Sequence, residues 1–407
     1  MSQAIETPGI DAGEDITTRT LSINFGPQHP ATHGTLRVKL EVLGENVVKA
    51  DPDIGFLHTG FEKLGEYHTF NQFVCTTDRM NYMSPLCNNF GFVHSVEELL
   101  EIELTPRCQY LRVILCELTR LADHVICTGL QAMDLGAFSV LLWSFIEREK
   151  LYDLFEIVTG ARLTTSFARV GGMMNDVPGE FVPRCRKFLR EFPLTLREIE
   201  KMLSRNRIFL DRTIGIAAIG PEDAVSYGCT GPILRATGVP YDVRRARPYW
   251  VYDELDFDVI TRTEGDVFAR YKVRVDEMKE SARIISQALD RLPGGPVNID
   301  DWKIVLPEKA AVYTQMESLI THFKLVMKGH GLKTPARGKI YSCTESTNGE
   351  LGWYLETDGS AVGYRVRCRP PSYINYGAMP QMVQGGYIAD VVACLSSLNV
   401  IAGELDR

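Results

Sequence analysis

The residues of this sequence best placed for proton chemistry lie on a short loop near its N-terminus. Residues 26–37 read GPQHPATHGTLR and set two imidazoles, His29 and His33, four positions apart. The prolines and glycines of the segment disfavour a regular helix and predict a tight, stiff loop. Because imidazole has an unperturbed pKa of about 6.5, either ring suits proton transfer near neutral pH. For a lone histidine, the more common interpretation is a loop residue that only hydrogen-bonds the backbone.

The loop opens onto a segment patterned as a β-hairpin. Residues 35–50 alternate apolar and polar side chains with a period of two about Gly-Glu-Asn, which predicts two antiparallel strands. From Asn81 to about Leu130 the apolar spacing is helical, and Thr105-Pro106 is a favourable helix start. A following helix from Leu135 to Val158 should end at Gly160. The histidine loop is therefore expected between a small sheet and a helical body.

The rest of the chain predicts further helices and a second set of strands. Helices are expected over Pro183–Arg205, 275–292, Glu308–Lys328 and Tyr387–Ser397, and strands over Lys339–Cys343, Gly352–Glu356 and Tyr364–Arg369, with turns at Asn348-Gly349 and Asp358-Gly359. Without a linker or an internal repeat, the chain predicts one α+β domain over 19–407 after a flexible tail over 1–18. Within this domain we expect a β-rich region 19–78, a mainly helical body 79–334, and a β-rich and C-terminal region 335–407.

Composition excludes several classes of protein. The 407 residues are 45% hydrophobic and 24% charged, which is typical of a globular chain with an extensive core. Charge-free stretches near the middle, such as the 12 residues from Leu135 to Ile146, are shorter than the roughly 20 residues of a bilayer span. The N-terminus lacks the pattern of a secretory signal, and a net charge of −8 argues against nucleic acid or anionic lipid as a partner. We therefore expect cytosolic residence, with membrane attachment only through protein partners.

The ten cysteines show no metal-binding spacing. None forms a Cys-x-x-Cys motif, so the usual zinc and iron–sulfur patterns are missing. Scattered thiols in a reducing compartment are more often small buried apolar residues than ligands. The sequence therefore predicts that this chain binds no metal.

Several separated blocks resemble one family, the 49-kilodalton or D-subunit family of the proton-pumping NADH:quinone oxidoreductase, respiratory complex I. The resemblance runs from about Leu21 to Arg407. It rests on the histidine loop and on six further blocks: IGFLHTGFEK at 54–63, DRMNY at 78–82, DLGA at 134–137, LRATG at 234–238, YDVR at 241–244 and DR at 406–407.

The resemblance also implies a fold like that of the large subunit of nickel–iron hydrogenases. Those enzymes hold their metals with one cysteine pair early in the chain and one near the C-terminus. The matching stretches here, 79–83 and 398–402, contain no cysteine. This implies that nickel chemistry is lost and that the cavity which held the metal is free for another use.

A quinone site of three groups follows from the resemblance. In the family, the residues matching His33 and Tyr82 hold the quinone headgroup, and the residue matching Asp134 pairs with the histidine. Quinone reduction takes two electrons and two protons, and both imidazole and phenol can offer a proton to a substrate carbonyl. A carboxylate near His33 would raise the pKa of that ring and fix its tautomer. Arg79 matches an arginine beside the terminal 4Fe–4S cluster of a neighbouring subunit, where its charge would favour cluster reduction.

Each residue also has a simpler interpretation. Tyr82 alone is typical of a core tyrosine, Asp134 of a helix N-cap, and Arg79 of a partner for a carboxylate. His29 is as readily structural as directly involved. The remaining histidines of the family blocks and their surroundings are expected to be packing or turn residues: His58 and His68.

Two positions depart from the family pattern. Many members carry a histidine close to the cluster after Gly-Ala-Arg and a hydrophobic residue, whereas Thr164 follows Gly160-Ala-Arg-Leu163 here. The usual aspartate near the C-terminus is Asn399. The first departure puts a proton-coupled role beside the cluster in doubt, and the second removes a possible buried charge from the cavity wall.

The sequence therefore predicts a peripheral subunit of an NADH:quinone oxidoreductase that forms the quinone-reduction chamber with a cluster-bearing partner. The resemblance implies as partners the B subunit, which carries the cluster, the C and I subunits, and the membrane-embedded H and A subunits, with NAD bound elsewhere in the complex. It implies a place on the cytoplasmic side of the cell inner membrane. Two alternatives stay open: a hydrogenase-like large subunit of another energy-converting redox complex, and a scaffold that binds partners without touching substrate.

Overall fold

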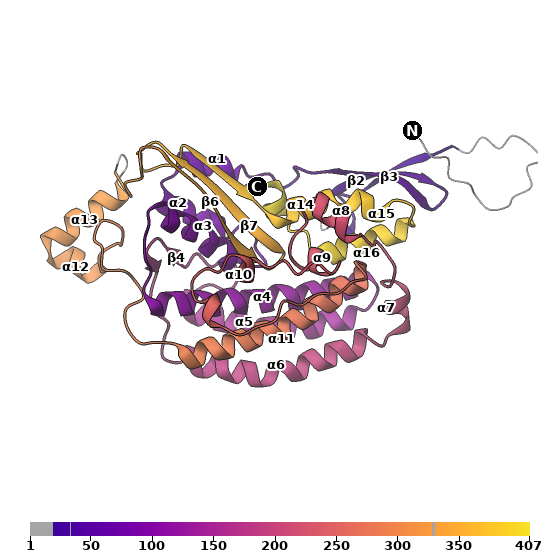
Figure 1. The fold of residues 1–407 in the computed structure, drawn as a ribbon, viewed down its shortest axis with the longest axis horizontal. Coiled ribbons are helices and arrows are strands. Elements are labelled where there is room, and N and C mark those ends of the chain that lie inside the picture. The colour runs from indigo at the N-terminus through magenta and orange to yellow at the C-terminus, as the bar shows by residue number, and fades with distance from the viewer. Residues whose placement is uncertain (1–18, 33, 328–329) are drawn as a thin grey trace, which may run out of the picture.

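Four long helices form the body of the molecule in the computed structural model, which describes residues 19–32, 34–327 and 330–407. These helices are α4 (Pro106–Asp134), α5 (Phe138–Thr159), α6 (Phe181–Leu203) and α11 (Val267–Arg291). Figure 1 shows them across the lower part of the molecule, where α4 packs against α5 and α11, and α6 contacts both of these neighbours. Most of the 29 residues of α4 are buried, as expected for the central helix.

Local sequence explains where two of these helices begin and end. Oγ1 of Thr105 accepts a hydrogen bond from the Cys108 amide at 3.3 Å, and Pro106 takes the first helical position, where no backbone donor is needed. Gly160 ends α5 with a φ of 74°, a left-handed conformation that glycine adopts without steric strain. The predicted start at Thr105-Pro106 and the predicted end at Gly160 are confirmed.

Charged side chains buried around α4 are held in ion pairs. Glu117 of α4 meets Arg244 at 2.9 Å, and Nε2 of His124 lies 2.9 Å from Glu277 of α11. Glu277 in turn binds Nε of Arg235 at 2.7 Å. Because a buried charge without a partner is strongly unfavourable, these pairs fix how α4 and α11 lie against each other.

The first sheet is antiparallel, in the order β1-β2-β3, from β1 (Leu21–Phe25), β2 (Arg37–Leu43) and β3 (Asn46–Asp53). The predicted hairpin of β2 and β3 is confirmed, whereas β1 was not expected. The loop between β1 and β2 contains the 3-10 turn Pro30–Thr32. Buried and exposed residues alternate along β2, so one face of the sheet packs inward.

The second sheet has the order β6-β7-β8, from β6 (Gly338–Ser346), β7 (Gly349–Thr357) and β8 (Arg365–Arg369). The turn predicted at Asn348-Gly349 joins β6 to β7, whose register pairs Ser346 with Gly349. Helix α3 (Pro85–Leu99) packs on β6 and β7, and Figure 1 shows this sheet above the helical body.

The C-terminal helices bring the two ends of the chain together. They are α14 (Pro371–Gly377), α15 (Met379–Val383), α16 (Ile388–Leu398) and α17 (Ala402–Asp406). Helix α16 contacts α4 and α11, while α15 contacts β3. In Figure 1 the yellow C-terminal segments accordingly lie beside the indigo N-terminal sheet.

The other described elements are short. They are α1 (Phe61–Tyr67), α2 (Phe70–Thr77), β4 (Ala168–Arg169), β5 (Gly172–Met173), α7 (Arg207–Asp211), α8 (Pro221–Ser226), α9 (Gly231–Arg235), α10 (Val243–Ala246), the 3-10 turn Tyr252–Glu254, α12 (Lys309–Thr314) and α13 (Met316–Val326). None of the helices in the described part of the chain combines the length and the apolar character that a bilayer span requires.

Several predicted boundaries need correction. The helical pattern from Asn81 to Leu130 contains two helices, α3 and α4, separated by a short loop. The helix predicted over 308–328 is divided into α12 and α13, because Gln315 is extended, with φ −124° and ψ 128°; residues 328 and 329 lie outside the described residues. The helix predicted over 275–292 begins earlier, at Val267. The mixed helix and sheet content agrees with the predicted α+β class.

Candidate functional site

A cavity of about 240 Å³ lies where α4, the end of α16 and the loop before β2 meet. Tyr82 and Asp134, two of the three predicted site residues, both line it, and the third, His33, lies outside the described residues. The remaining wall is mainly apolar: Ala31, Leu36, Met83, Cys127, Leu130, Leu395, Ser396, Asn399, Val400 and Ile401. The cavity therefore brings together the two cysteine-free stretches, 79–83 and 398–402.

Tyr82 lies in the short segment that connects α2 to α3, and its side chain is half-buried. Oδ1 of Asn81 accepts hydrogen bonds from the amides of Met83 and Ser84 at 3.2 and 3.0 Å, which folds this segment into a turn. Burial raises the pKa of Tyr82, and a hydrogen bond from the backbone of Ala402 opposes this shift only in part. The phenol is therefore protonated at neutral pH and can donate a hydrogen bond.

Asp134 is the last residue of α4, so the N-cap interpretation is wrong. Burial raises the pKa of its carboxyl to about 6. The helix dipole acts in the same direction, because a negative charge is unfavourable at a helix C-terminus. Oδ2 is buried and has no hydrogen-bond partner among the described residues. This carboxyl can therefore gain or lose a proton near neutral pH.

Asn399 forms the back of the cavity and ends α16 in a left-handed conformation, with a φ of 52°. Its Nδ2 donates to Oδ2 of Asp123 at 3.0 Å and to Oδ1 of Asn348 at 2.8 Å. Burial acts to raise the pKa of Asp123, but hydrogen bonding and charge from His124, and the Asn399 amide, outweigh it and lower that pKa. The wall is therefore neutral at position 399, with an ionised carboxylate directly behind it.

Arg79 and Thr164, the residues predicted to face the partner's cluster, are both exposed. Nη1 of Arg79 donates to the carbonyl oxygen of Cys75 at 2.9 Å. No carboxylate of the described chain lies within ion-pair distance of Arg79, so the simpler interpretation of this arginine finds no support here. Both side chains lie where a neighbouring subunit can contact them.

The histidines that were expected to be structural have structural contacts. The ring of His29 packs on Phe25 with centroids 4.3 Å apart, and its Nδ1 accepts the amide of Ala31 at 3.2 Å. Nδ1 of His58 lies 2.7 Å from the carbonyl oxygen of Asp406, so this ring ties the 54–63 block to the C-terminus. His68 caps the C-terminal end of α1.

Sequence reasoning missed Glu404, which is completely buried on α17. Its Oε2 accepts from Nδ2 of Asn81 at 2.6 Å, and its Oε1 accepts from the Ser372 amide at 3.0 Å. Burial raises the pKa of Glu404 to about 7. The terminal block DR at 406–407 marked this part of the chain, but a five-residue helix has too little periodicity to reveal which of its residues contacts Asn81.

The part of the chain that the structure describes contains no set of side chains suited to bind a metal ion. No group of three or more His, Cys, Asp or Glu side chains there is arranged to hold a metal ion. The ten cysteines are free thiols, and eight of them are buried, as predicted for small apolar residues. The residues present therefore do not fit a resident metal.

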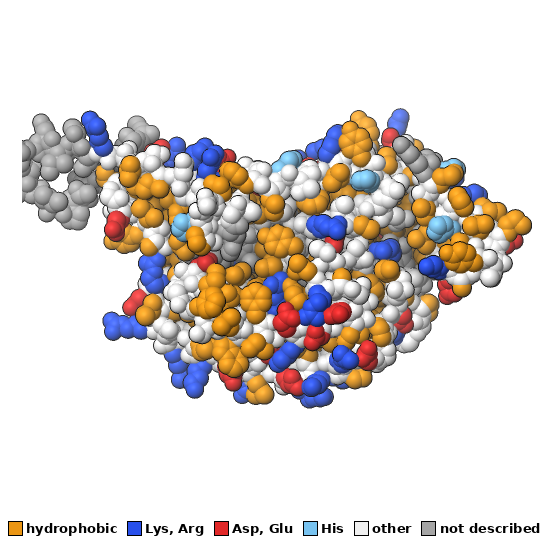
Figure 2. Space-filling view, turned by 180° about the vertical axis from the view of Figure 1, so that it is seen from behind, with side chains coloured by type: hydrophobic (Ala, Val, Ile, Leu, Met, Phe, Trp, Pro, Cys, Tyr) orange, Lys and Arg blue, Asp and Glu red, His pale blue; other side chains and the backbone are white. Residues whose placement is uncertain are grey.

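Helix α5 exposes an apolar stripe that begins four residues after Asp134. Phe138, Leu142, Phe145 and Ile146 recur at helical spacing and expose 57, 52, 39 and 52% of their surface. Figure 2, the view from behind, shows hydrophobic side chains gathered over the lower part of this face. Contiguous exposed apolar surface of this kind is typical of a face that a partner covers.

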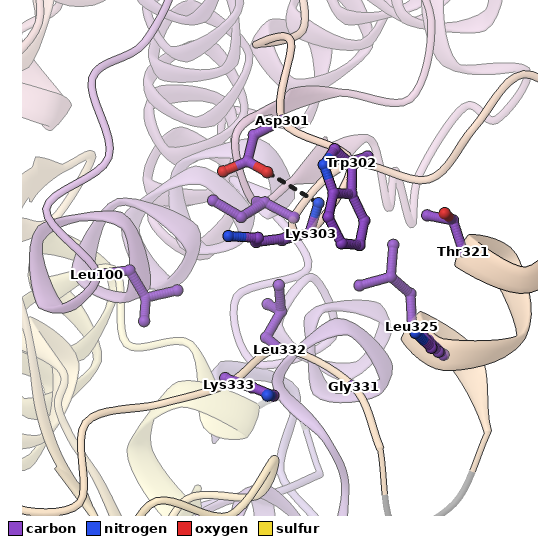
Figure 3. Close-up of a pocket in the computed structure, with 11 residues that line it drawn as sticks. Leu100, Asp301, Trp302, Lys303, Thr321, Leu325, Gly331, Leu332 and Lys333 are labelled. Atoms are coloured by element: carbon purple, nitrogen blue, oxygen red, sulfur yellow. Dashed lines mark hydrogen bonds between the residues drawn. The ribbon is translucent and has the colours of Figure 1, made fainter. Parts of the chain in front are cut away.

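A second hollow, of about 380 Å³, lies away from this site and shares no lining residue with it. Figure 3 shows Trp302 and the Asp301 carboxylate, which accepts the Lys303 amide at 2.8 Å, on one side and Leu325 of α13 on the other. Apolar side chains and three lysines, Lys303, Lys324 and Lys333, line it. Neither Tyr82 nor Asp134 reaches it.

Comparison with known proteins shows the family of the chain. The family model for the respiratory-chain NADH dehydrogenase 49 Kd subunit matches residues 134–407. A Myxococcus xanthus protein, named as the D subunit of NADH-quinone oxidoreductase, is 48% identical over 392 residues, covering 96% of this chain and 94% of that protein. A first D subunit of the same enzyme from Sorangium cellulosum is 49% identical over 398 residues, covering 98% of each chain, and a second D subunit from Koribacter versatilis is 46% identical over the full length of both. The chain therefore belongs to the family of NADH dehydrogenase 49 kDa subunits, and the predicted family is confirmed.

Proposed function

We propose that this chain is the subunit of a proton-pumping NADH:quinone oxidoreductase in which the quinone headgroup is reduced. One observation carries the proposal: Tyr82 and Asp134, which are distant in the sequence, line the same mainly apolar cavity. An apolar pocket with a few convergent polar groups is the usual form of a site for a small organic molecule. Membership in the 49 kDa subunit family supports quinone as that molecule.

The two groups have complementary tasks in this reaction. The Tyr82 phenol, held neutral by burial, donates a hydrogen bond to one quinone carbonyl and stabilises the negative charge that develops on its oxygen. His33 lies outside the described residues, and membership in the family supports its role as donor to the other carbonyl. In that role Asp134, whose pKa is about 6, would be the proton partner of His33.

The electrons come from a partner in the complex. A 4Fe–4S cluster held by the B subunit would supply them, and the exposed guanidinium of Arg79 would be this chain's contribution beside it. The apolar stripe of α5 supports docking of a partner on the face that begins near the cavity. The C, I, H and A subunits complete the surroundings, NAD binds elsewhere in the complex, and these partners hold the chain on the cytoplasmic side of the inner membrane.

A hydrogenase-like metal enzyme is the second candidate. The shared wall of stretches 79–83 and 398–402 supports descent from the large subunit of nickel–iron hydrogenases. The same stretches lack the cysteines that would bind nickel, so the ligand chemistry disfavours this candidate as an activity. If the chain were a scaffold that binds only partner proteins, Tyr82 and Asp134 would have no role in the cavity.

Replacing Tyr82 with phenylalanine tests the proposal. Loss of a transition-state donor typically lowers a rate by about 10²–10³. We expect short-chain quinone reduction by the intact complex to fall by this factor, while reduction of the clusters by the electron donor continues. Tyr313→Phe, at a tyrosine that is 79% exposed on α12, is the matched control and should leave turnover unchanged. Turnover within twofold of wild type in Tyr82→Phe, with the complex intact, would refute the assignment.

A further inference from the structure

The turn at residues 81–84, which contains Tyr82, is hydrogen-bonded to the buried side chain of Glu404. Asn81, the residue before Tyr82, is completely buried, and its Nδ2 lies 2.6 Å from Oε2 of Glu404. Oδ1 of Asn81 already accepts the amides of Met83 and Ser84. The Asn81 amide therefore cannot turn over without losing two backbone hydrogen bonds, and its NH₂ group must face Glu404.

Helix α17 also meets this segment through its backbone. A Cβ atom on Gly403 would lie 2.8 Å from the carbonyl oxygen of Met80 and 3.0 Å from that of Arg79, so only glycine allows this approach. The backbone of Ala402 lies close enough to the Tyr82 phenol to act on its pKa, which it lowers against the effect of burial. Three successive residues of α17, ending at Glu404, thus contact the segment that carries Tyr82.

We propose that Glu404 is a positioning residue for quinone reduction, which holds the Asn81 amide and thereby fixes the direction in which the Tyr82 phenol enters the cavity. Glu404 is absent from the cavity wall, so it acts through Tyr82 and not on the substrate. The inference rests on the proposed function of Tyr82. A carboxyl group fits this place because Asn81 Nδ2 and the Ser372 amide donate to different oxygens of the side chain, whereas an amide offers only one acceptor oxygen.

A double-mutant cycle in the intact complex tests this role. Glu404→Gln leaves one of the two donors unpaired, and a small misplacement of a catalytic group lowers rates by up to about a hundredfold. We expect Glu404→Gln to lower kcat for quinone reduction at least tenfold with cluster reduction unchanged. In a Tyr82→Phe background the same substitution should have less than a twofold effect, because the group that it positions is already gone.

Exchange of the two polar groups provides a rescue. In the variant that combines Asn81→Asp with Glu404→Gln, the new carboxylate accepts the Met83 and Ser84 amides with one oxygen and the new amide with the other, and the glutamine oxygen accepts the Ser372 amide. All donors are again paired, so turnover should return to within about threefold of wild type. Asn81→Asp alone sets two carboxylates face to face and should be the most impaired variant.

The control variant is Glu62→Gln. Glu62 also accepts a hydrogen bond from the C-terminal residue, from Nε of Arg407 at 3.1 Å, and a second from the Cys368 amide of β8 at 3.1 Å, but no hydrogen bond joins it to residues 81–84. It should leave kcat unchanged even where it lowers stability.

The outcomes distinguish the proposed function of Tyr82 from the positioning role of Glu404. If Tyr82→Phe leaves quinone turnover unchanged, the proposed function itself is refuted. A strong effect of Tyr82→Phe, combined with a Glu404→Gln effect that is absent or fully additive, would overturn only the positioning role. If Glu404→Gln fails to assemble, the exchanged pair decides, since an assembled but inactive exchanged variant contradicts the proposal.

Discussion

Replacing Asn399 with aspartate should destabilise the chain in a way that depends on pH. The Asn399 amide donates to the buried carboxylate of Asp123 at 3.0 Å and to the side-chain oxygen of Asn348 at 2.8 Å. An ionised aspartate has no donor, so both hydrogen bonds are lost and two carboxylates meet in a buried place. A hydrogen bond to a charged group contributes about 1.5–3 kcal/mol, which sets the scale of the loss. The left-handed backbone at this position tolerates aspartate, so strain contributes little.

The sign of the pH dependence follows from the pKa of the new carboxyl. Burial and the neighbouring charge of Asp123 raise its pKa in the folded chain above the unfolded value of about 3.9. Below that value the group is protonated in both states, and it can donate one hydrogen bond to Asp123. As the pH rises above about 3.9, each unit lowers the stability of the variant by about 1.4 kcal/mol relative to wild type, until the folded group ionises. Between pH 5 and pH 7 the added loss is thus up to about 3 kcal/mol.

Denaturant unfolding of the purified chain between pH 5 and pH 8 measures this difference. Asn206→Asp is the matched control, because Oδ1 of Asn206 accepts the amides of Ile208 and Phe209 at a helix N-cap, a role that aspartate fills equally well. The control should stay within about 0.5 kcal/mol of wild type at every pH. An equal destabilisation by Asn399→Asp at pH 5 and pH 7 would refute the reasoning, since the new carboxyl would then not be held protonated against Asp123.

Two further predictions concern groups whose charge matters near neutral pH. Since burial raises the pKa of Asp134 to about 6, Asp134→Asn should stabilise the chain at pH 8 by up to about 3 kcal/mol and by about half as much at pH 5, yet lower quinone turnover. Equal stability of both proteins at pH 8 would contradict the burial argument. Thr164 does not titrate, so the potential of the partner's terminal cluster should change little between about pH 6 and 8, and Thr164→His should steepen the dependence toward about 59 mV per pH unit. Redox titration followed by electron paramagnetic resonance measures this pH dependence. A slope of the full ~59 mV per pH unit in the wild type would show that a group other than residue 164 couples a proton to reduction of the cluster.

Local sequence signals predicted the elements that have strong periodicity or clear end signals. Thr105-Pro106, Gly160 and the turn at 348–349 were found because each needs a particular residue type for a particular backbone geometry. The break between α12 and α13 was missed because the apolar pattern continues through Gln315, although its backbone is extended. Among the described residues the structure shows no tertiary contact that explains this break, since no residue of α12 is buried and Gln315 is exposed.

For the candidate site, too, the sequence revealed some residues and not others. Tyr82 and Asp134 were singled out by family resemblance, and the cavity that they share could not be derived from spacing, because about fifty residues separate them. Glu404 was missed for a related reason. Its importance lies in one contact with Asn81, a residue more than three hundred positions earlier, and neither residue type has a local signal.

The charges around the cavity indicate which residue of its wall can give a proton to the quinone of the proposed function. Permanent charges such as Asp123 lie behind the wall, where hydrogen bonds and ion pairs compensate their burial. In the described wall itself, Tyr82 has a raised pKa, Cys127 has a pKa of about 11, and Asn399 does not titrate. Asp134, with a pKa of about 6, is therefore the one described wall residue that changes charge near neutral pH. In its protonated form Asp134 is the strongest acid of the described wall, so it can pass a proton to the reduced quinone, while the neutral Tyr82 donates a hydrogen bond.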